Sequence, residues 1–263
     1  MTELSAVLAS LNLPDWQYFV EVGSTNDLAL AWAEQGAADG SLVLADRQTA
    51  GRGRADRRWV TKPGAALAMS LVLRPTAAEV AYIPRFTALA ALGLVEALAK
   101  HGLTAEVKWP NDVLIGARKV AGVLVEAFWL GERPEALIVG MGVNVSQEAL
   151  PPAEELRFPA TCIEDEMGES VDRWDILAGI LHSILTYRKI LTTEAFLAAW
   201  NEKLAWKGEQ IAFRFANGQV KLARVLAIEP DGRLSLQIEG QAKPFLAAAG
   251  EIELAGHGGR LSA

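Results

Sequence analysis

One polar stretch of the sequence contains the residue types of an anion-binding site. Between Gln48 and Trp59 it reads Gln-Thr-Ala-Gly-Arg-Gly-Arg-Ala-Asp-Arg-Arg-Trp. The planar guanidinium of arginine binds carboxylate and phosphate oxygens through paired hydrogen bonds, and glycine lets the backbone approach a ligand closely. The stretch lacks the Gly-Lys-Ser/Thr ending of a P-loop and the third glycine of a dinucleotide-binding turn. Spacing alone therefore leaves two interpretations open, an anion-binding loop and a solvated basic loop.

Three further clusters follow along the chain. Residues 108–112 (Lys-Trp-Pro-Asn-Asp) predict a proline-fixed turn that presents an amide and a carboxylate. Residues 118–126 place one lysine, Lys119, at the start of an apolar run that contains Gly122. Residues 140–145 hold two glycines in a strand-like run, which indicates close approach by a ligand or by another backbone. Taken singly, each cluster also fits a plain structural interpretation: a stable turn, a solvent-exposed lysine or a β-bulge.

Hydrophobic patterning predicts the elements that position these clusters. The arginine-rich stretch lies in a long segment, residues 46–63, that has no apolar period and is expected to be a functional loop. Strands joined by short turns surround the other clusters, which favours an α+β fold with a mixed, largely antiparallel sheet and helices packed on one face. We expect strands at 18–22, 41–45, 66–73, 106–108, 113–115, 120–128 and 136–143, and helices at 24–36, 84–100, 174–191 and 193–204.

The C-terminal part of the sequence has a different pattern. Short alternating runs are separated there by Asn217-Gly218 and Asp231-Gly232, which are strong hairpin signals. Such strands predict a small β-barrel, since closing a sheet removes its exposed edges. We therefore predict two domains, residues 1–207 and residues 208–263.

The composition fits a folded protein and excludes several classes. The 263 residues are 51% apolar and 22% charged, far from the profile of a disordered chain. A formal net charge of -7 argues against a polyanion binder. The single cysteine, Cys162, cannot form an intramolecular disulfide and fits a cytoplasmic location. The sequence contains neither a signal peptide nor an uninterrupted apolar run of membrane-spanning length, so we expect no membrane partner.

In their order and spacing, the clusters together resemble the biotin protein ligases. The resemblance covers nearly the whole chain and extends to residues 243–245 and 250–252, which are similar to the closing motif of that family. Because little chain precedes the first motif, the sequence resembles the monofunctional members that lack a DNA-binding domain. The motifs that carry the resemblance are Ser24-Thr25-Asn26, Gly51-Arg52-Gly53-Arg54 with Trp59, residues 108–112, Lys119 with Gly122, and Gly142 with Asn144.

The resemblance implies an ATP-dependent enzyme that uses Mg2+ and converts biotin to biotinyl-5'-AMP. It further implies transfer of the biotin to one lysine of a biotin carboxyl carrier protein domain, in acetyl-CoA carboxylase or a related carboxylase. The C-terminal barrel is then expected to be SH3-like, and DNA is not expected as a partner. The sequence leaves open whether the protein is a monomer or a homodimer.

The resemblance also implies roles for individual residues. Lys119, Arg54 and Arg52 are the expected catalytic residues, and Asp112 is the expected magnesium ligand. The arginine-rich loop is expected to close over the intermediate and exclude water. The expected biotin-binding residues are Ser24, Thr25, Asn26, Gln48, Gly51, Arg52, Arg54, Trp59, Lys119, Gly122, Leu124 and Gly142. The expected nucleotide-binding residues are Arg54, Arg57, Trp59, Asn111, Asp112, Lys119, Asn144 and Phe245.

Two positions depart from the family pattern. Ala55-Asp56 stands where relatives often carry Arg-Gly, which removes a positive charge from the loop and adds a negative one. Phe245 stands where some relatives carry a tryptophan, and either ring can stack on adenine. Two other functions remain as alternatives: a lipoate ligase or octanoyl transferase of the same superfamily, and a nucleic-acid-binding module that uses the loop at residues 47–62.

Overall fold

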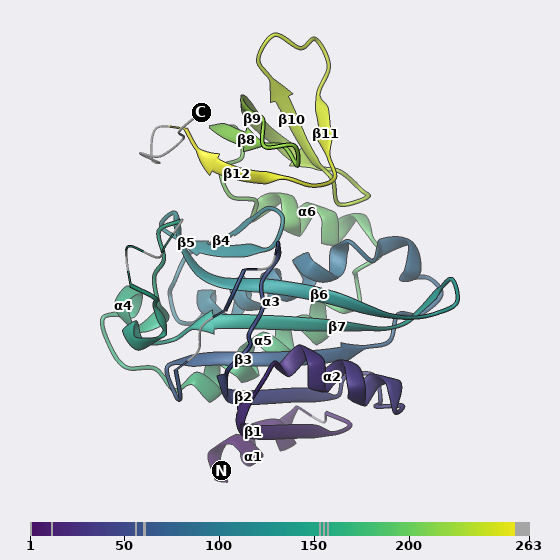
Figure 1. The fold of residues 1–263 in the computed structure, drawn as a ribbon, viewed down its shortest axis with the longest axis vertical. Helices are drawn as coiled ribbons and strands as arrows, with labels where there is room; N and C mark the ends of the chain where they lie inside the picture. Colours follow the sequence, from purple (N-terminus) through teal and green to yellow (C-terminus); the bar gives the residue numbers. More distant parts are fainter. Residues whose placement is uncertain are drawn as a thin grey trace.

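A seven-stranded sheet forms the larger part of the protein (Figure 1). The computed structural model describes residues 2–11, 13–55, 57–59, 62–152, 154, 156 and 158–255. The strand order is β1-β2-β3-β7-β6-β5-β4, in which β1 and β2 are parallel and the other neighbours are antiparallel. The predicted mixed, largely antiparallel sheet is thus confirmed. Its strands are β1 (Trp16–Val22), β2 (Leu42–Gln48), β3 (Ala66–Leu73), β4 (Ala105–Lys108), β5 (Asp112–Ile115), β6 (Arg118–Leu130) and β7 (Arg133–Asn144).

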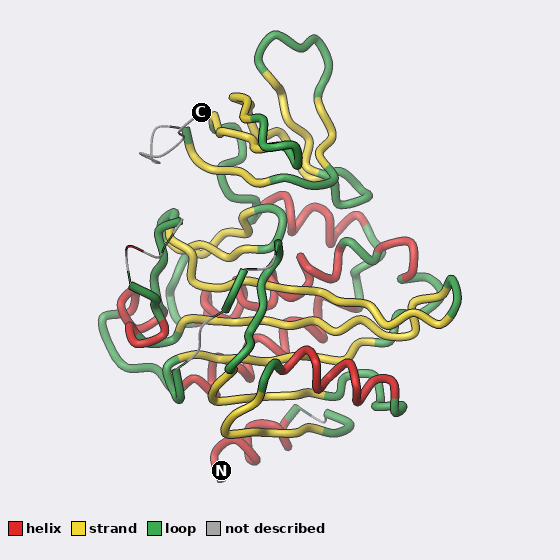
Figure 2. Tube along the Cα trace, in the orientation of Figure 1, coloured by secondary structure: helices red, strands yellow, loops and turns green. Residues whose placement is uncertain are grey.

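Helices lie on both faces of this sheet, and Figure 2 distinguishes them in red from the yellow strands. They are α1 (Thr2–Ser10), α2 (Thr25–Glu34), α3 (Arg85–Lys100), α4 (Ile163–Met167), α5 (Arg173–Arg188) and α6 (Glu194–Glu202), with short 3-10 turns η1 (Val80–Tyr82) and η2 (Gln147–Ala149). Hydrophobic patterning predicted neither α1 nor α4. Among the described residues, no helix is long and apolar enough to cross a membrane.

The largest core lies between the sheet and the pair α3 and α5. Small residues let these two helices approach closely. A Cβ on Gly93 of α3 would lie 2.7 Å from Ile184 Cγ1, and one on Gly179 of α5 would lie 3.0 Å from Ala97 Cβ. The alanine-rich sequence of α3 therefore buries one face against the sheet and another against α5.

The prediction that the helices pack on one face is wrong for α2, which lies in front of the sheet in Figure 1 while α3 and α5 lie behind it. Val72 of β3 and Ile138 of β7 point toward α2, where Ala29 and Ala33 cover them in a second, smaller core. The cause is visible in β3, whose residues are all buried. An apolar run without alternation needs cover on both faces of its sheet.

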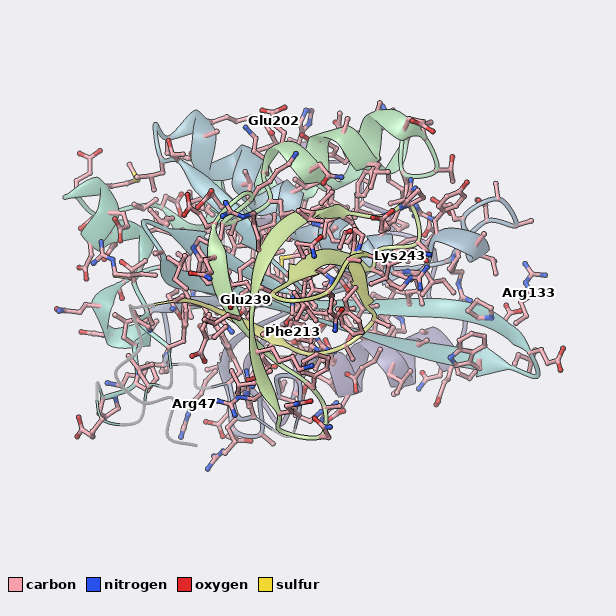
Figure 3. All side chains as sticks on the ribbon, turned by 90° about the horizontal axis from the view of Figure 1, so that it is seen from above. Arg47, Arg133, Glu202, Phe213, Glu239 and Lys243 are labelled. Atoms are coloured by element: carbon pink, nitrogen blue, oxygen red, sulfur yellow. The ribbon has the colours of Figure 1, made fainter. Side chains whose placement is uncertain are left out.

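A second, five-stranded antiparallel sheet follows α6, and Figure 3 looks down on it. Its strand order is β11-β10-β9-β8-β12. Because β11 and β12 end this order and no pairing between them occurs among the described residues, closure into a barrel stays a prediction. The domain boundary after residue 207 also stays a prediction. The strands are β8 (Gln210–Arg214), β9 (Val220–Ile228), β10 (Leu234–Ile238), β11 (Phe245–Ala247) and β12 (Glu251–Leu254).

Two side chains of the larger part hold the turn between β9 and β10. The buried guanidinium of Arg85 donates to the carbonyl oxygen of Pro230 at 3.0 Å. Trp109 Nε1 donates to the carbonyl oxygen of Gly232 at 3.2 Å. Because Trp109 belongs to the cluster at residues 108–112, the C-terminal sheet is attached directly to one of the predicted functional clusters.

The single cysteine is enclosed by the core. Cys162 directly precedes α4 and has 0% of its surface exposed. Burial raises the pKa of its thiol to about 11. The group is therefore a protonated, unreactive thiol at neutral pH.

Candidate active site

A cavity of about 600 Å³ brings together nearly all of the predicted site residues. Its volume lies within the usual range of small-molecule pockets. Of the predicted residues, Gly51 and Phe245 are not part of the lining. Those that line it are Ser24, Thr25, Asn26, Gln48, Arg52, Arg54, Arg57, Trp59, Asn111, Asp112, Lys119, Gly122, Leu124, Gly142 and Asn144.

Two rows of directly paired strand residues form the floor of the cavity. Residues paired across neighbouring strands point their side chains to the same face of a sheet. That face is the one on which α2 packs, and the glycines in both rows let side chains from other segments lie directly against it. The first row is Ser70, Gly140 and Leu124, and the second row is Ala68, Gly142, Gly122 and Asp112.

An uncharged hydrogen-bonded cluster lies at the first row. Gln48 Oε1 accepts from the N–H of Thr25 at 2.8 Å and from its hydroxyl at 3.1 Å. Ser70 Oγ lies 2.7 Å from Thr25 Oγ1 and 2.6 Å from Asn26 Oδ1. Residue 140 must be a glycine, because a Cβ there would lie 2.1 Å from Asn26 Oδ1. The cluster presents hydroxyl and amide groups suited to a polar, uncharged ligand.

The arginine-rich stretch, predicted as a loop without regular structure, contains a short hairpin. Arg52 and Arg58 form an isolated antiparallel β-bridge. Between them, the N–H of Gly53 donates to the carbonyl oxygen of Arg57 at 2.7 Å. These backbone contacts give the stretch a fixed shape over the cavity, although its sequence has no strand-like alternation.

Gly51 and Trp59 close the base of this hairpin. The N–H of Trp59 donates to the carbonyl oxygen of Gly51 at 2.9 Å, and a Cβ on Gly51 would lie 2.4 Å from the carbonyl oxygen of Trp59. Gly51 therefore shapes the hairpin without lining the cavity. At the tip, Ala55 has a φ of 54°, in the left-handed region, and its neighbour Asp56 lies outside the described residues.

Two carboxylates hold Arg52 at the rim of the cavity. Arg52 Nη2 lies 2.6 Å from Asp27 Oδ1 and 3.2 Å from Glu126 Oε2. The hydrogen bond to Asp27, together with the charge of Glu126, raises the pKa of the guanidinium. Glu126 also accepts a hydrogen bond from Asn26 Nδ2 at 2.6 Å. Asp27 and Glu126 were not predicted from the sequence, since neither belongs to a recognisable motif.

Arg54 and Arg57 face other partners. Arg57 forms an ion pair with Glu251 of β12, which joins the hairpin to the C-terminal sheet. Arg54 lines the cavity on the side of Asp112. Partial burial lowers the pKa of the Arg54 guanidinium, and Arg57 adds to this while Asp112 acts against it. Arg54 therefore brings positive charge to the cavity.

The indole of Trp59 lies over the second row of the floor. A Cβ on Gly142 would lie 2.2 Å from Trp59 Cε2, and one on Gly122 would lie 3.6 Å from Trp59 Cζ3. Lys119 Nζ lies 5.7 Å from the ring centroid, close enough for a cation–π interaction. Trp59 Nε1 is buried and has no hydrogen-bond partner among the described residues. An unpaired buried donor costs free energy, which a ligand that accepts its hydrogen bond would recover.

The carboxylate of Asp112 lies between two ammonium groups. Lys119 Nζ is 2.6 Å from Asp112 Oδ1, and Lys108 Nζ is 3.1 Å from Asp112 Oδ2. Burial by itself raises the pKa of Asp112, but the two lysines outweigh burial and the net shift is downward. Asp112 is therefore ionised at neutral pH. Asp112 and Lys119 were predicted as site residues from the sequence, whereas Lys108 was given no role.

The same arrangement does not fit the predicted role of Asp112 as a magnesium ligand. Both of its oxygens are already paired with lysine ammonium groups. Across the described part of the chain, no three His, Cys, Asp or Glu side chains gather in a way that could hold a metal ion. Mg2+ in nucleotide sites is commonly bound by substrate phosphates and water together with one or two carboxylates. The described side chains therefore offer no preformed metal site, and magnesium would enter with a nucleotide.

The segment after β7 fixes the backbone of Lys119. The N–H of Lys119 donates to the carbonyl oxygen of Pro159 at 2.7 Å, and the N–H of Thr161 donates to the carbonyl oxygen of Lys119 at 2.9 Å. Asn144 Nδ2 donates to the carbonyl oxygen of Thr161 at 3.0 Å, so it braces this segment from β7. This wall of the cavity was not predicted, because the proline-rich segment that forms it has no periodic pattern in the sequence. Its lining residues are Pro151, Leu156, Phe158 and Ala160.

Phe245 lies in the C-terminal sheet and does not reach the cavity lining. Its ring centroid is 5.3 Å from that of Phe215 and 5.9 Å from that of Phe213. The predicted stacking of Phe245 on adenine therefore has no support from the position of the ring. A motif in the sequence indicates which residues occur together but not which way a ring turns.

Comparison with known proteins connects the cavity to a family. Residues 18–144 match the model of the Biotin/lipoate A/B protein ligase family, and this range includes every predicted residue that lines the cavity. The "Bifunctional ligase/repressor BirA" of Bacillus spizizenii is 34% identical over 240 residues, which cover 89% of this chain and 72% of that protein. The "Biotin--[acetyl-CoA-carboxylase] ligase" of Paracoccus denitrificans is 36% identical over 202 residues, which cover 73% of this chain and 81% of that protein.

A solved structure shares the fold over nearly its full length. It is the biotin protein ligase from Aquifex aeolicus in complex with biotin and ATP. The two chains are 28% identical, and their superposition has a TM-score of 0.77 with 92% of this chain and 99% of that chain covered.

Proposed function

Because the chain belongs to the biotin/lipoate A/B protein ligase family, we propose that it activates biotin with ATP to biotinyl-5'-AMP and transfers the biotin to a lysine of a carrier protein. A relative is named for acetyl-CoA carboxylase, so the acceptor is the biotin carboxyl carrier protein domain of that enzyme or of a related carboxylase. This proposal rests on the cavity. In it, the uncharged cluster around Thr25 and Gln48 lies beside a cationic cluster that contains Lys119 and Arg54.

The uncharged cluster at the first row is the proposed site of the biotin ring system. Thr25 and Gln48 hydrogen-bond with the ureido group, whose burial is tolerated only when its polar atoms are paired. The indole of Trp59 supplies an apolar wall. Gly142 and Gly122 of the floor let this indole lie directly against the sheet. The other proposed biotin contacts are Ser24, Asn26, Gly122, Leu124 and Gly142.

The cationic cluster at the second row is the proposed site of adenylate formation. A carboxylate oxygen of biotin attacks the α-phosphorus of ATP, and the bond between this phosphorus and pyrophosphate breaks. Both reactants are anions, so the step requires cations that hold them together and neutralise the charge that develops. Lys119 binds both the carboxylate of biotin and the α-phosphate of ATP, and Arg54 binds the phosphates. Arg57 and Asn111 complete the nucleotide side, and magnesium arrives bound to ATP.

In the second step, the amine of the carrier lysine attacks the carbonyl carbon of the mixed anhydride. The new carbon–nitrogen bond replaces the bond to AMP, which leaves, and the amine loses a proton. Water would compete with this amine, and the hairpin over the cavity excludes it. Arg52 contributes by anchoring the hairpin to Asp27 and Glu126.

We also propose that a separate SH3-like domain begins at residue 208. Its ion pair with Arg57 and its hydrogen bond with Trp109 support a role in holding the hairpin and the cluster at residues 108–112. The buried, protonated thiol of Cys162 needs no oxidising compartment, which supports the cytoplasm as the place of action.

Pyrophosphate release tests the proposed function. The purified protein is incubated with magnesium and ATP, together with biotin in one sample and lipoate in another. We expect pyrophosphate release in the sample with biotin and none in the sample with lipoate. Biotin transfer to an isolated carrier domain should follow. Pyrophosphate release only in the sample with lipoate would assign the chain to the lipoate branch of the family. Binding of DNA with steep salt dependence and no pyrophosphate release would favour the nucleic-acid-binding alternative.

Two assays of Lys119→Ala separate the steps. We expect adenylate formation to fall by at least about a hundredfold, since the lysine supplies the charge between two anions. Transfer from chemically prepared biotinyl-5'-AMP should fall much less, because the phosphate bond is already made. Unchanged adenylate formation would remove Lys119 from the catalytic role.

A further inference from the structure

Lys108 has no assigned role in the proposed reaction, yet it shares a buried carboxylate with the reactive lysine. The side chains of Lys108 and Asp112 are each 10% exposed, and that of Lys119 is 25% exposed. Lys108 and Asp112 are directly paired across the β4–β5 hairpin, so their side chains leave the same face of the sheet. The pairing is therefore set by strand register and not by chance contact between flexible side chains.

Lys108 lies next to the wall of the cavity. It is not among the described residues that line the cavity. Its ammonium lies 4.8 Å from the ring centroid of Phe158, and Phe158 itself is part of the lining. Phe158 and Asp112 thus stand between Lys108 and the cavity. Any influence on the reaction must pass through Asp112.

The charges of the three groups explain what this influence would be. With Lys108 present, one carboxylate is shared by two ammonium groups and the triad carries a net positive charge. Without Lys108, Asp112 and Lys119 would form a neutral pair. In a partly buried site the Coulomb attraction within such a pair is strong, so the ammonium of Lys119 would be held on Asp112.

We propose that Lys108 is a positioning residue for adenylate formation, which shares the carboxylate of Asp112 and thereby leaves the ammonium of Lys119 free to bind the anions of the substrates. The inference rests on the proposed function, because it gives Lys108 a task only in a reaction between two anions. Asp112 presents a different oxygen to each lysine, Oδ1 to Lys119 and Oδ2 to Lys108, so both ammonium groups bind one carboxylate at the same time.

Kinetics of Lys108→Met test the proposal, since methionine keeps most of the length of the side chain and removes its charge. We expect kcat for biotinyl-5'-AMP formation to fall by at least about tenfold while KM for biotin changes by less than about threefold, because the contacts of the biotin ring are untouched. Lys108→Arg, which retains a cation, should stay within about threefold of the wild type. Lys100→Met, at an exposed lysine of α3, is the matched control and should leave both constants unchanged.

The same substitution in a protein that already carries Asp112→Asn distinguishes a positioning role from general structural damage. In Asp112→Asn no carboxylate remains to be shared, so adding Lys108→Met should change kcat by less than about twofold. A further tenfold fall in the double variant, or a Lys108→Arg variant as slow as Lys108→Met, would overturn the proposal. Lys108→Met alone could lose its cooperative thermal transition. In that case, the kcat values of Asp112→Asn and of the double variant decide the question, since the double variant has no buried carboxylate left without a partner.

The wild-type protein keeps the two proposals separate. If it releases pyrophosphate with biotin and Lys108→Met is equally fast, the positioning role is wrong and the proposed function stands. If the wild type releases none with biotin, the proposed function fails and the role of Lys108 fails with it.

Discussion

The indole of Trp59 lies against the backbone of Gly142 at a distance that allows no side chain between them. An ideal Cβ on Gly142 would be 2.2 Å from Trp59 Cε2 and 2.4 Å from Trp59 Nε1. Trp59 closes the base of the arginine-rich hairpin, whereas Gly142 belongs to the inner strand β7. This contact therefore holds the base of the hairpin against the sheet.

We expect Gly142→Ala to displace Trp59 and to weaken biotin binding. The added methyl group meets a rigid ring system and not the end of a flexible chain, so the hairpin has to move. KM for biotin should rise by at least about tenfold, which corresponds to about 1.4 kcal/mol of binding free energy. Gly23→Ala is the control, because a Cβ at Gly23 meets nothing within 4 Å. Equal KM values for the two variants would contradict the role of Trp59 as a wall of the biotin site.

Ala55→Gly should relieve backbone strain at the tip of the hairpin. Ala55 has a φ of 54°, and an L-residue in the left-handed region costs about 1–2 kcal/mol. Glycine removes this cost but adds about 0.5–1 kcal/mol of unfolded-state entropy, so we expect no loss of stability and a gain of up to about 1.5 kcal/mol. Ala31→Gly, at an exposed position of α2, should instead destabilise by about 1 kcal/mol. Chemical denaturation measures both, and similar losses in the two variants would rule out strain at Ala55.

Glu126→Gln should loosen the hairpin by weakening the anchor of Arg52. The carboxylate of Glu126 accepts from both Arg52 and Asn26. We expect trypsin to cut after Arg52 and Arg54 at least about threefold faster in this variant, since cleavage requires local opening of the segment. Fragment masses measure the cleavage. Glu21→Gln, which breaks the exposed ion pair with Arg47, should leave the cleavage rate of the hairpin unchanged.

Saturation with biotin and ATP should slow the same cleavage in the wild-type protein, because the hairpin is expected to close over the bound intermediate. Tryptic digestion is followed with and without the two substrates. Equal cleavage rates at residues 52–58 would argue that the hairpin has the same exposure in both states and is not a lid.

The ion pair of Glu79 with Arg188 predicts a stability that depends on pH. Glu79 Oε1 lies 2.9 Å from Arg188 Nε, and both side chains are largely buried. Burial raises the pKa of Glu79, but hydrogen bonds from Arg188 and Thr76 outweigh it and the net pKa is lowered. The folded state thus binds the proton more weakly than the unfolded state. The contribution of Glu79 to the free energy of unfolding is fully present above the pKa of about 4.3 that a glutamate has in the unfolded state. It is lost as the pH falls through the lower pKa of Glu79 in the folded state.

Glu79→Gln should therefore lower the free energy of unfolding by about 3 kcal/mol at neutral pH, as expected when one partner of a buried ion pair is removed. Its stability should also fall less than that of the wild type between neutral pH and about pH 3.5. Urea unfolding measures both quantities. Glu202→Gln is the control, because the Glu202 side chain is 71% exposed and lies at the outer edge of the molecule in Figure 3. If the free energy of unfolding had the same pH dependence in Glu79→Gln and in the wild type, Glu79 would not be the source of the loss of stability at low pH.

Strand positions follow from the hydrophobic pattern because buried backbone must be covered by apolar side chains. The predicted strand at 66–73 coincides with β3, and the predicted strand at 136–143 lies within β7. The same pattern does not say which helix covers which face, so α2 could not be assigned to the face opposite α3. Only the contacts of Val72 and Ile138 reveal it.

The candidate site was predictable as a set of residue types but not as a set of partners. Gln48 and Thr25 were expected to face a ligand, and they do line the cavity. The anchors of Arg52 lie on α2 and β6, and the backbone partner of Lys119 is Pro159. These pairings depend on how distant segments fold together, which no local spacing encodes. The hairpin itself is held by backbone hydrogen bonds, which leave no side-chain pattern in the sequence.

The burial of Cys162 leaves the protein without a reactive thiol on its surface, since this is the only cysteine in the sequence. A cysteine placed at Arg58, which is exposed on the hairpin, would then be the one group that a maleimide dye or a nitroxide reagent can modify. Fluorescence or spin-resonance signals from that label would follow the hairpin in real time, on the otherwise native chain.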